Sequence, residues 1–224
     1  MKRKSIIEIN GQKFLRIPLK TKILTPDDDM LQIVKKFSKD FIEKGDIISI
    51  SESPLAITQG RAIPIKDLKI GLLAKFLWRF VAKVKYGTGL RAPYSMQCAI
   101  DETGSCRILF AAFVGALGKL IGRKGNFYRV AGMQAALIDA AFTSPVPPYD
   151  QCVIKGPKYP AKAAQRIKDA IGHETAIMDI NDIGGCWMIG GSDKISKNFM
   201  EKVMKDNPQG QGDELTPICL IRKA

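Results

Sequence analysis

The alternation of apolar and polar residues predicts strands near both ends of the chain. Residues 6–17 read as two strands joined by a turn at Asn10 and Gly11, the pair that best fits a two-residue hairpin turn. A short buried strand is predicted over residues 46–51, and the segment SESPLAITQGR that follows is expected to form a loop closed by Gly60 and Arg61. TPICLIRK predicts a last strand.

Apolar residues repeated every three to four positions predict helices between these strands. The expected helices cover residues 26–43, 70–84, 160–171 and 196–205. Gly45 and Gly172 are the expected stops of the first and third helices. The apolar run 108–117 is too short to span a membrane and is expected to be a buried strand or helix.

Residues 174–192, ETAIMDINDIGGCWMIGGS, predict a strand, an acidic loop and a second strand. Mixed strands and helices without a strict βαβ repeat indicate an α+β fold, with mixed sheets and packed helices. The length allows one domain over residues 1–224 or two subdomains of about 1–90 and 91–224. The proline-rich segment SPVPPYDQ is the expected connector between two structural units.

Composition narrows the class of protein. Apolar residues make up 46% of the chain and charged residues 25%, as in globular proteins. The five cysteines lack CxxC spacing, so neither a zinc site nor a disulfide framework is expected, and the start MKRKSIIEIN lacks a signal sequence. A cytoplasmic location is therefore expected. His173 is the single histidine and leaves little room for catalysis by a Ser-His or Cys-His pair.

Positive charge is concentrated in the middle of the chain. Residues 61–130 hold 13 Lys and Arg but three acids, which accounts for +10 of the total +13. Such a field attracts polyanions, namely nucleotide phosphates, nucleic acid or an anionic membrane. The basic segment 70–84 could lie on a membrane surface, although packing against the core is favoured. Nucleic acid is not expected as a partner, because aromatic residues are not interleaved with the basic ones.

The acidic loop is the first candidate for chemistry. Asp179 ends an apolar run, and Asn181 and Asp182 follow before Gly184 and Gly185. Crowded carboxylate and amide oxygens suit Mg2+ or Mn2+, usually shared with a substrate phosphate. The alternative is an ordinary Asn-Asp turn whose side chains bind backbone N–H groups.

Several segments, in order, resemble the coenzyme F420-0:γ-glutamyl ligases. They are Asp27–Asp29, GDIISISESPLAITQGR, GNFYRVAG, the strand end with Asp179 and Asp182, and the loop 211–217. The resemblance implies a cytosolic α+β enzyme that is a homodimer. It further implies that GTP, or another nucleoside triphosphate, and Mg2+ or Mn2+ are used to join glutamate to a deazaflavin precursor through an amide bond. The small-molecule partners would be the nucleotide and the carboxylate substrate.

That reaction needs an acyl phosphate, because a carboxylate is a poor electrophile. Metal and cations must neutralise the triphosphate during phosphoryl transfer. The candidate metal ligands are Asp179 and Asp182, with Asn181 supporting them and Asp101 as a weaker further ligand, more simply read as a turn acid. The candidate phosphate contacts are Arg61, Arg91 and Arg129, each with a solvated or structural role as the alternative. Asp213 and Glu214 are expected either to close the site or to cap the surface.

The chain also departs from the family pattern. The segment SESPLAITQ lacks the lysine that these ligases carry there, and no arginine follows NDIGG. Two alternatives to a ligase therefore stay open. One is a non-ligating relative that binds an anionic small molecule, and the other is a peripheral membrane or polyanion binder.

Overall fold

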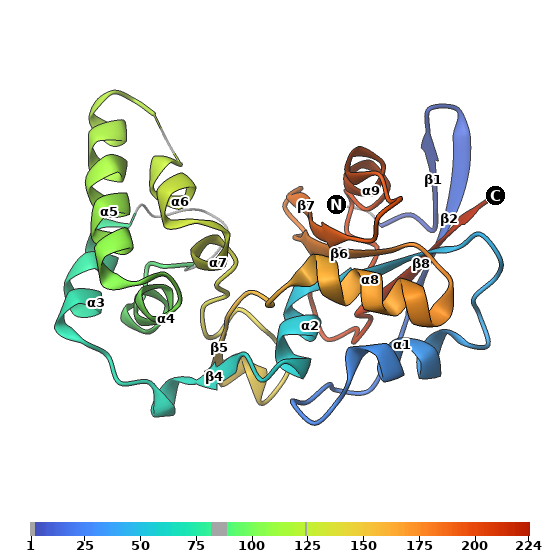
Figure 1. Ribbon diagram of the computed structural model, residues 1–224, viewed down its shortest axis with the longest axis horizontal. Coiled ribbons are helices and arrows are strands. Elements are labelled where there is room, and N and C mark those ends of the chain that lie inside the picture. Colours follow the sequence, from blue (N-terminus) through green and yellow to red (C-terminus); the bar gives the residue numbers. More distant parts are fainter. Residues whose placement is uncertain (1–2, 82–88, 124) are drawn as a thin grey trace. The chain divides into compact units, whose positions relative to one another are not determined.

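The structure is a computed structural model that describes residues 3–81, 89–123 and 125–224. The chain forms two compact units (Figure 1). The first unit comprises the chain up to Gly60 together with Pro157–Ala224, and the second comprises Arg61–Gly156. The second unit is thus inserted into the first. The division near residue 90 and the proline-rich segment 144–151 both fall inside the second unit.

A six-stranded mixed sheet forms the centre of the first unit, with the order β1-β2-β8-β3-β6-β7. The strands are β1 (Ile6–Ile9), β2 (Gln12–Leu19), β3 (Ile47–Ser51), β6 (Thr175–Ile180), β7 (Cys186–Gly191) and β8 (Ile218–Lys223). Neighbouring strands are antiparallel except for β3 and β6. The predicted hairpin is confirmed, since Asn10 and Gly11 have φ values of 52° and 78° between β1 and β2, as a type I′ turn requires.

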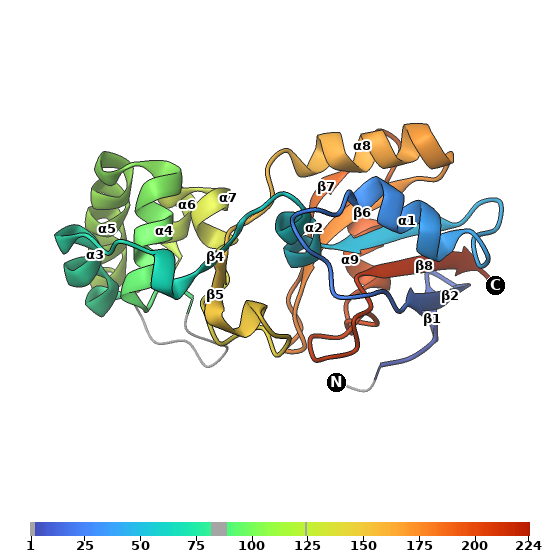
Figure 2. The ribbon, with the colours of Figure 1, turned by 90° about the horizontal axis from the view of Figure 1, so that it is seen from below.

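Helices cover the two faces of this sheet (Figure 2). On one side lie α1 (Met30–Ser38) and α8 (Pro160–Ile171), and on the other lies α9 (Lys197–Val203). Successive side chains of β6 point to opposite faces of the sheet, so the strand contributes to the core on both sides of the sheet. Ala176 and Met178 pack with Met200 and Val203 of α9, while Ile177 between them is also fully buried.

Helix boundaries in the first unit correct two predictions. The helix expected over 26–43 is shorter, because the Asp29 carboxylate caps α1 by accepting from the backbone of Leu31 at 2.8 Å, and the Ser38 hydroxyl donates back to the carbonyl of Val34 at its end. The expected loop after β3 is wrong in part, since Glu52–Thr58 form α2. Its Pro54 lies in the first turn, where a proline is tolerated.

The second unit is mainly helical. It contains α3 (Leu72–Leu77), α4 (Pro93–Thr103), α5 (Ser105–Leu120), α6 (Asn126–Ala131) and α7 (Met133–Ala136), the short 3-10 helices η1 (Ile65–Asp67), η2 (Trp78–Phe80) and η3 (Tyr149–Gln151), and the antiparallel pair β4 (Ala62–Pro64) and β5 (Cys152–Ile154). Its core gathers buried residues of α4, α5 and β5 around Met96, Ile108 and Val153.

Two predictions change in the second unit. The helix expected over 70–84 is described only as α3 and η2, and residues 82–88 lie outside the described part of the chain. The apolar run 108–117 lies in α5 and is buried only in part: Ile108 and Ala111 are fully buried, whereas Phe110 and Phe113 are each 60% exposed. The α+β class is confirmed by the mixed sheet and its helices.

Candidate active site at the carboxyl edge of the sheet

The parallel pair β3 and β6 brings two carboxyl strand ends to one edge of the sheet. Ser51, the last residue of β3, pairs with Met178 of β6. The next residues along the two strands are therefore Glu52, which begins α2 and is buried, and Asp179. The carboxyl ends of parallel strands are where α/β sheets commonly bind ligands. The acidic loop between β6 and β7 leaves the sheet at this edge.

Asn181 serves the turn of that loop. Its side-chain oxygen accepts from the backbone N–H of Gly185 at 2.8 Å and of Ile183 at 3.3 Å. Gly184 has a φ of +98°, and a Cβ on Gly185 would overlap the Asn181 amide and the Trp187 ring. Asn181 thus has the role of an ordinary turn residue, the alternative to metal binding, because its side-chain oxygen already accepts from two backbone N–H groups.

Asp182 is held by residues from distant parts of the first unit. Its Oδ2 lies 3.1 Å from Nη2 of Arg3, and its Oδ1 accepts from Nδ2 of Asn207 at 2.7 Å. The backbone N–H of Asp182 donates to the Gln211 side chain at 3.0 Å. The Asp182 carboxylate is thus fixed in position, and its charge is met by a guanidinium.

Arg3 joins Asp182 to a second carboxylate. Its Nη1 donates to Glu214, whose other oxygen accepts from the backbone N–H of Gly212 at 2.7 Å. Burial tends to raise the pKa of Glu214, but the bonds from Arg3 and Gly212 bring that pKa below its ordinary value. The bond to Glu214 raises the pKa of Arg3. Two carboxylates from separate loops therefore converge on one cation, while the neighbouring Asp213 is exposed.

Asp179 contributes to a second concentration of negative charge. Burial raises the pKa of the Cys186 thiol to about 12, helped by the nearby charges of Glu201, Asp179 and Asp206. The Cys186 thiol is therefore protonated and is not a nucleophile. Asp206 is neutralised by Arg16, a side chain with no exposed surface, whose Nη2 lies 2.9 Å from Oδ2 of Asp206.

The other predicted site residues belong to the second unit. Arg61 is an internal contact: its Nη2 lies 2.9 Å from Oε2 of Glu102 and 3.1 Å from Oε1 of Gln134. Asp101 in α4 accepts from the Gln97 side chain at 2.7 Å. Arg91 is half-buried before α4, and Arg129 is exposed on α6. The structure therefore gives Arg61 a structural partner and leaves Arg129 open to solvent.

The carboxylates of Asp182 and Glu214 suit a cation that is also bound by a substrate phosphate. Among the described residues, no group of three or more His, Cys, Asp or Glu could hold a metal ion by itself. Mg2+, however, commonly takes one or two carboxylates and completes its coordination with water and substrate phosphates. Asp182 and Glu214 already converge on one positive group. Their arrangement fits such a site, with Arg3 in the place of the metal.

Three of these contact residues were missed from the sequence. They are Arg3, Asn207 and Gln211, none of which is among the site residues that the sequence predicts. The contact from Arg3 to Asp182 spans 179 positions. Local pattern carries no information about a pairing of that range.

Comparisons with known proteins support the resemblance drawn from the sequence. A family model described as F420-0:Gamma-glutamyl ligase matches residues 18–183. A search of curated proteins finds no match.

Among the described residues, no single helix is long and apolar enough to cross a membrane. The bent pair α4 and α5 meets the criteria of length and composition together, with an angle of 116° between the helices.

Proposed function

Because the chain belongs to the F420-0:gamma-glutamyl ligase family, we propose that it joins glutamate to a carboxylate of a deazaflavin precursor, using a nucleoside triphosphate and a divalent cation. The observation that carries this proposal is the convergence of Asp182 and Glu214 on Arg3, at the carboxyl edge of the parallel strands. The family is a ligase family, and the nucleotide, the metal and the intermediate are the proposed parts.

The chemistry proceeds in two transfers. The substrate carboxylate attacks the γ-phosphorus, the bond to the leaving nucleoside diphosphate breaks, and an acyl phosphate forms. The glutamate amine then attacks the acyl carbon, loses a proton and expels inorganic phosphate. A bound Mg2+ or Mn2+ would supply charge neutralisation for the triphosphate.

The residues of the first unit would divide this work. Asp182 and Glu214 would hold the metal, and Asp179 would add negative charge at the same edge. Arg3 pairs with the two carboxylates, and the metal would displace it from them. The phosphate contacts expected of Arg91 and Arg129, which belong to the second unit, stay a prediction from the sequence alone. Arg61 is excluded from that role in this proposal by its buried pairing with Glu102.

Thermal unfolding with and without ligand tests the binding step. GTP or ATP with Mn2+ should raise the Tm, since a ligand that binds only the folded state stabilises it. The variant Asp179→Asn/Asp182→Asn should lose this shift. Asp40→Asn, which makes the same kind of substitution once at an exposed position of the first unit, should keep it. A shift that survives in the double variant would remove Asp179 and Asp182 from the site.

Trapping the intermediate tests the reaction. Hydroxylamine added to enzyme, nucleotide, Mn2+ and the deazaflavin acid should yield a hydroxamate only if an acyl phosphate forms. Glutamate should instead yield an amide and release one phosphate for each bond. Binding of nucleotide without either product would favour the alternative, a non-ligating relative that binds an anionic small molecule.

The homodimer implied by the family is a separate prediction. Light scattering should give the mass of two chains.

A further inference from the structure

The helix α5 carries its large apolar residues on the outside. Five of them point away from the core of the second unit, with Phe110 and Phe113 each 60% exposed and Leu120 83% exposed; the others are Leu109 and Leu117. At 100° per residue these five positions fall within an arc of about 100°. The described chain therefore presents a continuous apolar stripe along more than three turns of helix.

The opposite side of α5 packs into the core through Ile108 and small residues. Ala111 and Gly118 are buried, and Gly115 and Gly118 lie against α6. A Cβ on Gly118 would overlap the Asn126 amide and lie 3.2 Å from the carbonyl oxygen of Arg123, and one on Gly115 would lie 3.1 Å from Cβ of Phe127. Close packing against α6 thus uses the glycines. The large side chains are left without a role in the core.

A second apolar stripe lies on α3 and η2. Leu72, Phe76 and Phe80 recur every four residues and are 84%, 56% and 67% exposed. The rings of Phe76 and Phe80 have centroids 5.0 Å apart. Lys75 and Arg79, both exposed, lie beside them in the sequence. This segment therefore exposes an apolar stripe with two cations at its side.

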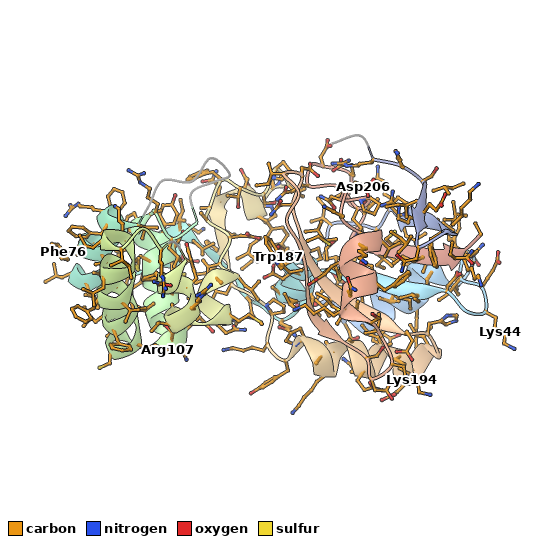
Figure 3. The ribbon with its side chains drawn as sticks, turned by 90° about the horizontal axis from the view of Figure 1, so that it is seen from above. Lys44, Phe76, Arg107, Trp187, Lys194 and Asp206 are labelled. Carbon is orange, nitrogen blue, oxygen red and sulfur yellow. The ribbon has the colours of Figure 1, made fainter. Side chains whose placement is uncertain are left out.

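The helices that carry the two stripes lie at one end of the second unit. In Figures 1 and 2, α3 and α5 lie at the end of the unit away from β4 and β5, and Figure 3 shows Phe76 at that end. We call this surface the apolar end; it comprises Leu72, Phe76, Phe80, Leu109, Phe110, Phe113, Leu117 and Leu120. A phenylalanine carries ~150–250 Å² of surface, so the four exposed rings alone present roughly 400–600 Å². Exposed patches of this size usually mark an interaction site.

Charge decides which partner fits the apolar end. Exposed cations lie on the same helices or directly after them: Lys75, Arg79, Lys119 and Arg123. Residues 61–130 carry 13 basic and three acidic residues, and Glu102, one of the acids, is already paired with Arg61 and Lys155. Two copies joined through this surface would place like charges against each other. An anionic membrane offers phosphate headgroups to the cations and an apolar layer to the exposed phenylalanines and leucines.

We propose that the apolar end of the second unit docks on an anionic membrane surface. The phenylalanines and leucines enter the boundary between headgroups and acyl chains, and the lysines and arginines contact the headgroup phosphates. The attachment is peripheral and reversible. It places a ligase at a membrane surface, and it does not depend on the proposed nucleotide or metal.

Vesicle flotation with the full chain tests this proposal. The protein should float with phosphatidylcholine vesicles that contain phosphatidylserine, and should bind vesicles of phosphatidylcholine alone much more weakly. Phe110→Ser/Phe113→Ser should weaken binding roughly tenfold or more, because both rings lose apolar contact. Lys75→Gln/Arg79→Gln should weaken it by roughly fivefold for each charge removed, and the effect should shrink at high salt.

The matched control is Phe41→Ser, which removes an exposed phenylalanine from the first unit and should leave flotation unchanged. Circular dichroism should show that each variant stays folded, since the replaced side chains face solvent. Three outcomes would overturn the proposal. They are absence of flotation with the anionic vesicles, retention in alkaline carbonate as for an integral protein, and conversion of a dimer to a monomer by Phe110→Ser/Phe113→Ser. The last outcome would assign the surface to a second copy of the chain.

Discussion

Arg3 lies 3.1 Å from the carboxylate of Asp182 and also binds Glu214. Asp182 falls inside the segment matched by the ligase family, residues 18–183, whereas Arg3 and Glu214 fall outside it. Arg3 and Glu214, which lie outside the matched segment, therefore belong to the same cluster as Asp182 inside it. Because one guanidinium satisfies both carboxylates, Arg3 and a metal ion would compete for the same oxygens.

Replacement of Arg3 should therefore tighten metal-nucleotide binding. Arg3→Gln removes two partly exposed ion pairs, each worth ~0.2–1 kcal/mol, so the Kd for Mn2+ with a non-hydrolysable GTP analogue should fall about two- to thirtyfold. Calorimetric titration measures this change. Lys44→Gln, an equal charge change at another exposed position of the first unit, should leave the Kd unaltered. Weaker binding in Arg3→Gln would instead make Arg3 a phosphate ligand.

The buried pair of Arg16 and Asp206 should be essential for the stability of the first unit. The Arg16 side chain has no exposed surface and also donates to the carbonyl of Val203 at 2.9 Å. Asp206→Asn should lower the free energy of unfolding by ~3–5 kcal/mol, because it leaves a buried charge without its counter-ion. Arg16→Met/Asp206→Leu should recover most of that loss. Urea unfolding of the three proteins gives the comparison, and a mild effect of Asp206→Asn alone would contradict it.

Acid should weaken the first unit partly through Asp46. Burial acts to raise the pKa of Asp46, but Arg222 and the N–H of Glu43 hold that pKa below its ordinary value. The contribution is therefore present above pH ~3.9, the ordinary value, and is lost as the pH falls through the folded pKa. Asp46→Asn should cost about 1.5–3 kcal/mol at pH 7 and little at pH 2.5. Urea midpoints at both pH values test this, and an equal loss at both would exclude titration of Asp46.

Glu102 should stabilise the second unit by neutralising Arg61 and Lys155. The three side chains are 8%, 11% and 14% exposed, respectively. Glu102→Gln should destabilise the chain by ~3–5 kcal/mol because two largely buried cations lose their carboxylate.

Arg61→Gln should lower the Tm without altering the Kd for nucleotide. A large change in that Kd with an unaltered Tm would restore Arg61 as a phosphate contact.

Gly190 should not tolerate a side chain. A Cβ there would lie 2.5 Å from the backbone N of Ala161 and the backbone C of Pro160, where α8 begins against β7. Gly190→Ala should therefore cost ~1–3 kcal/mol or more through overpacking. Gly71→Ala is the control, because its added methyl would meet the end of the flexible Gln97 side chain at 3.3 Å. Thermal melts should rank Gly190→Ala as the less stable variant.

Local pattern succeeded where neighbouring residues decide the structure. The Asn10-Gly11 turn, the strands β3, β6, β7 and β8, and the helix α8 between Pro160 and Gly172 are confirmed. It failed where longer-range packing decides. The segment SESPLAITQGR predicts a loop, but its residues Glu52–Thr58 form α2. The apolar run in α5 predicts burial, but its phenylalanines are exposed.

The sequence by itself determined the α+β class, the basic middle of the chain and the acidic loop, because these depend on composition and on spacing over a few residues. The match over residues 18–183 assigned the family. Only the tertiary structure decided that Arg3, Asp182 and Glu214 meet, that Asn181 is used by its own turn, and that α5 faces outward. Those outcomes depend on which strands pair and which helix face packs. Contacts between residues far apart in the chain settle both, and a local pattern does not encode them.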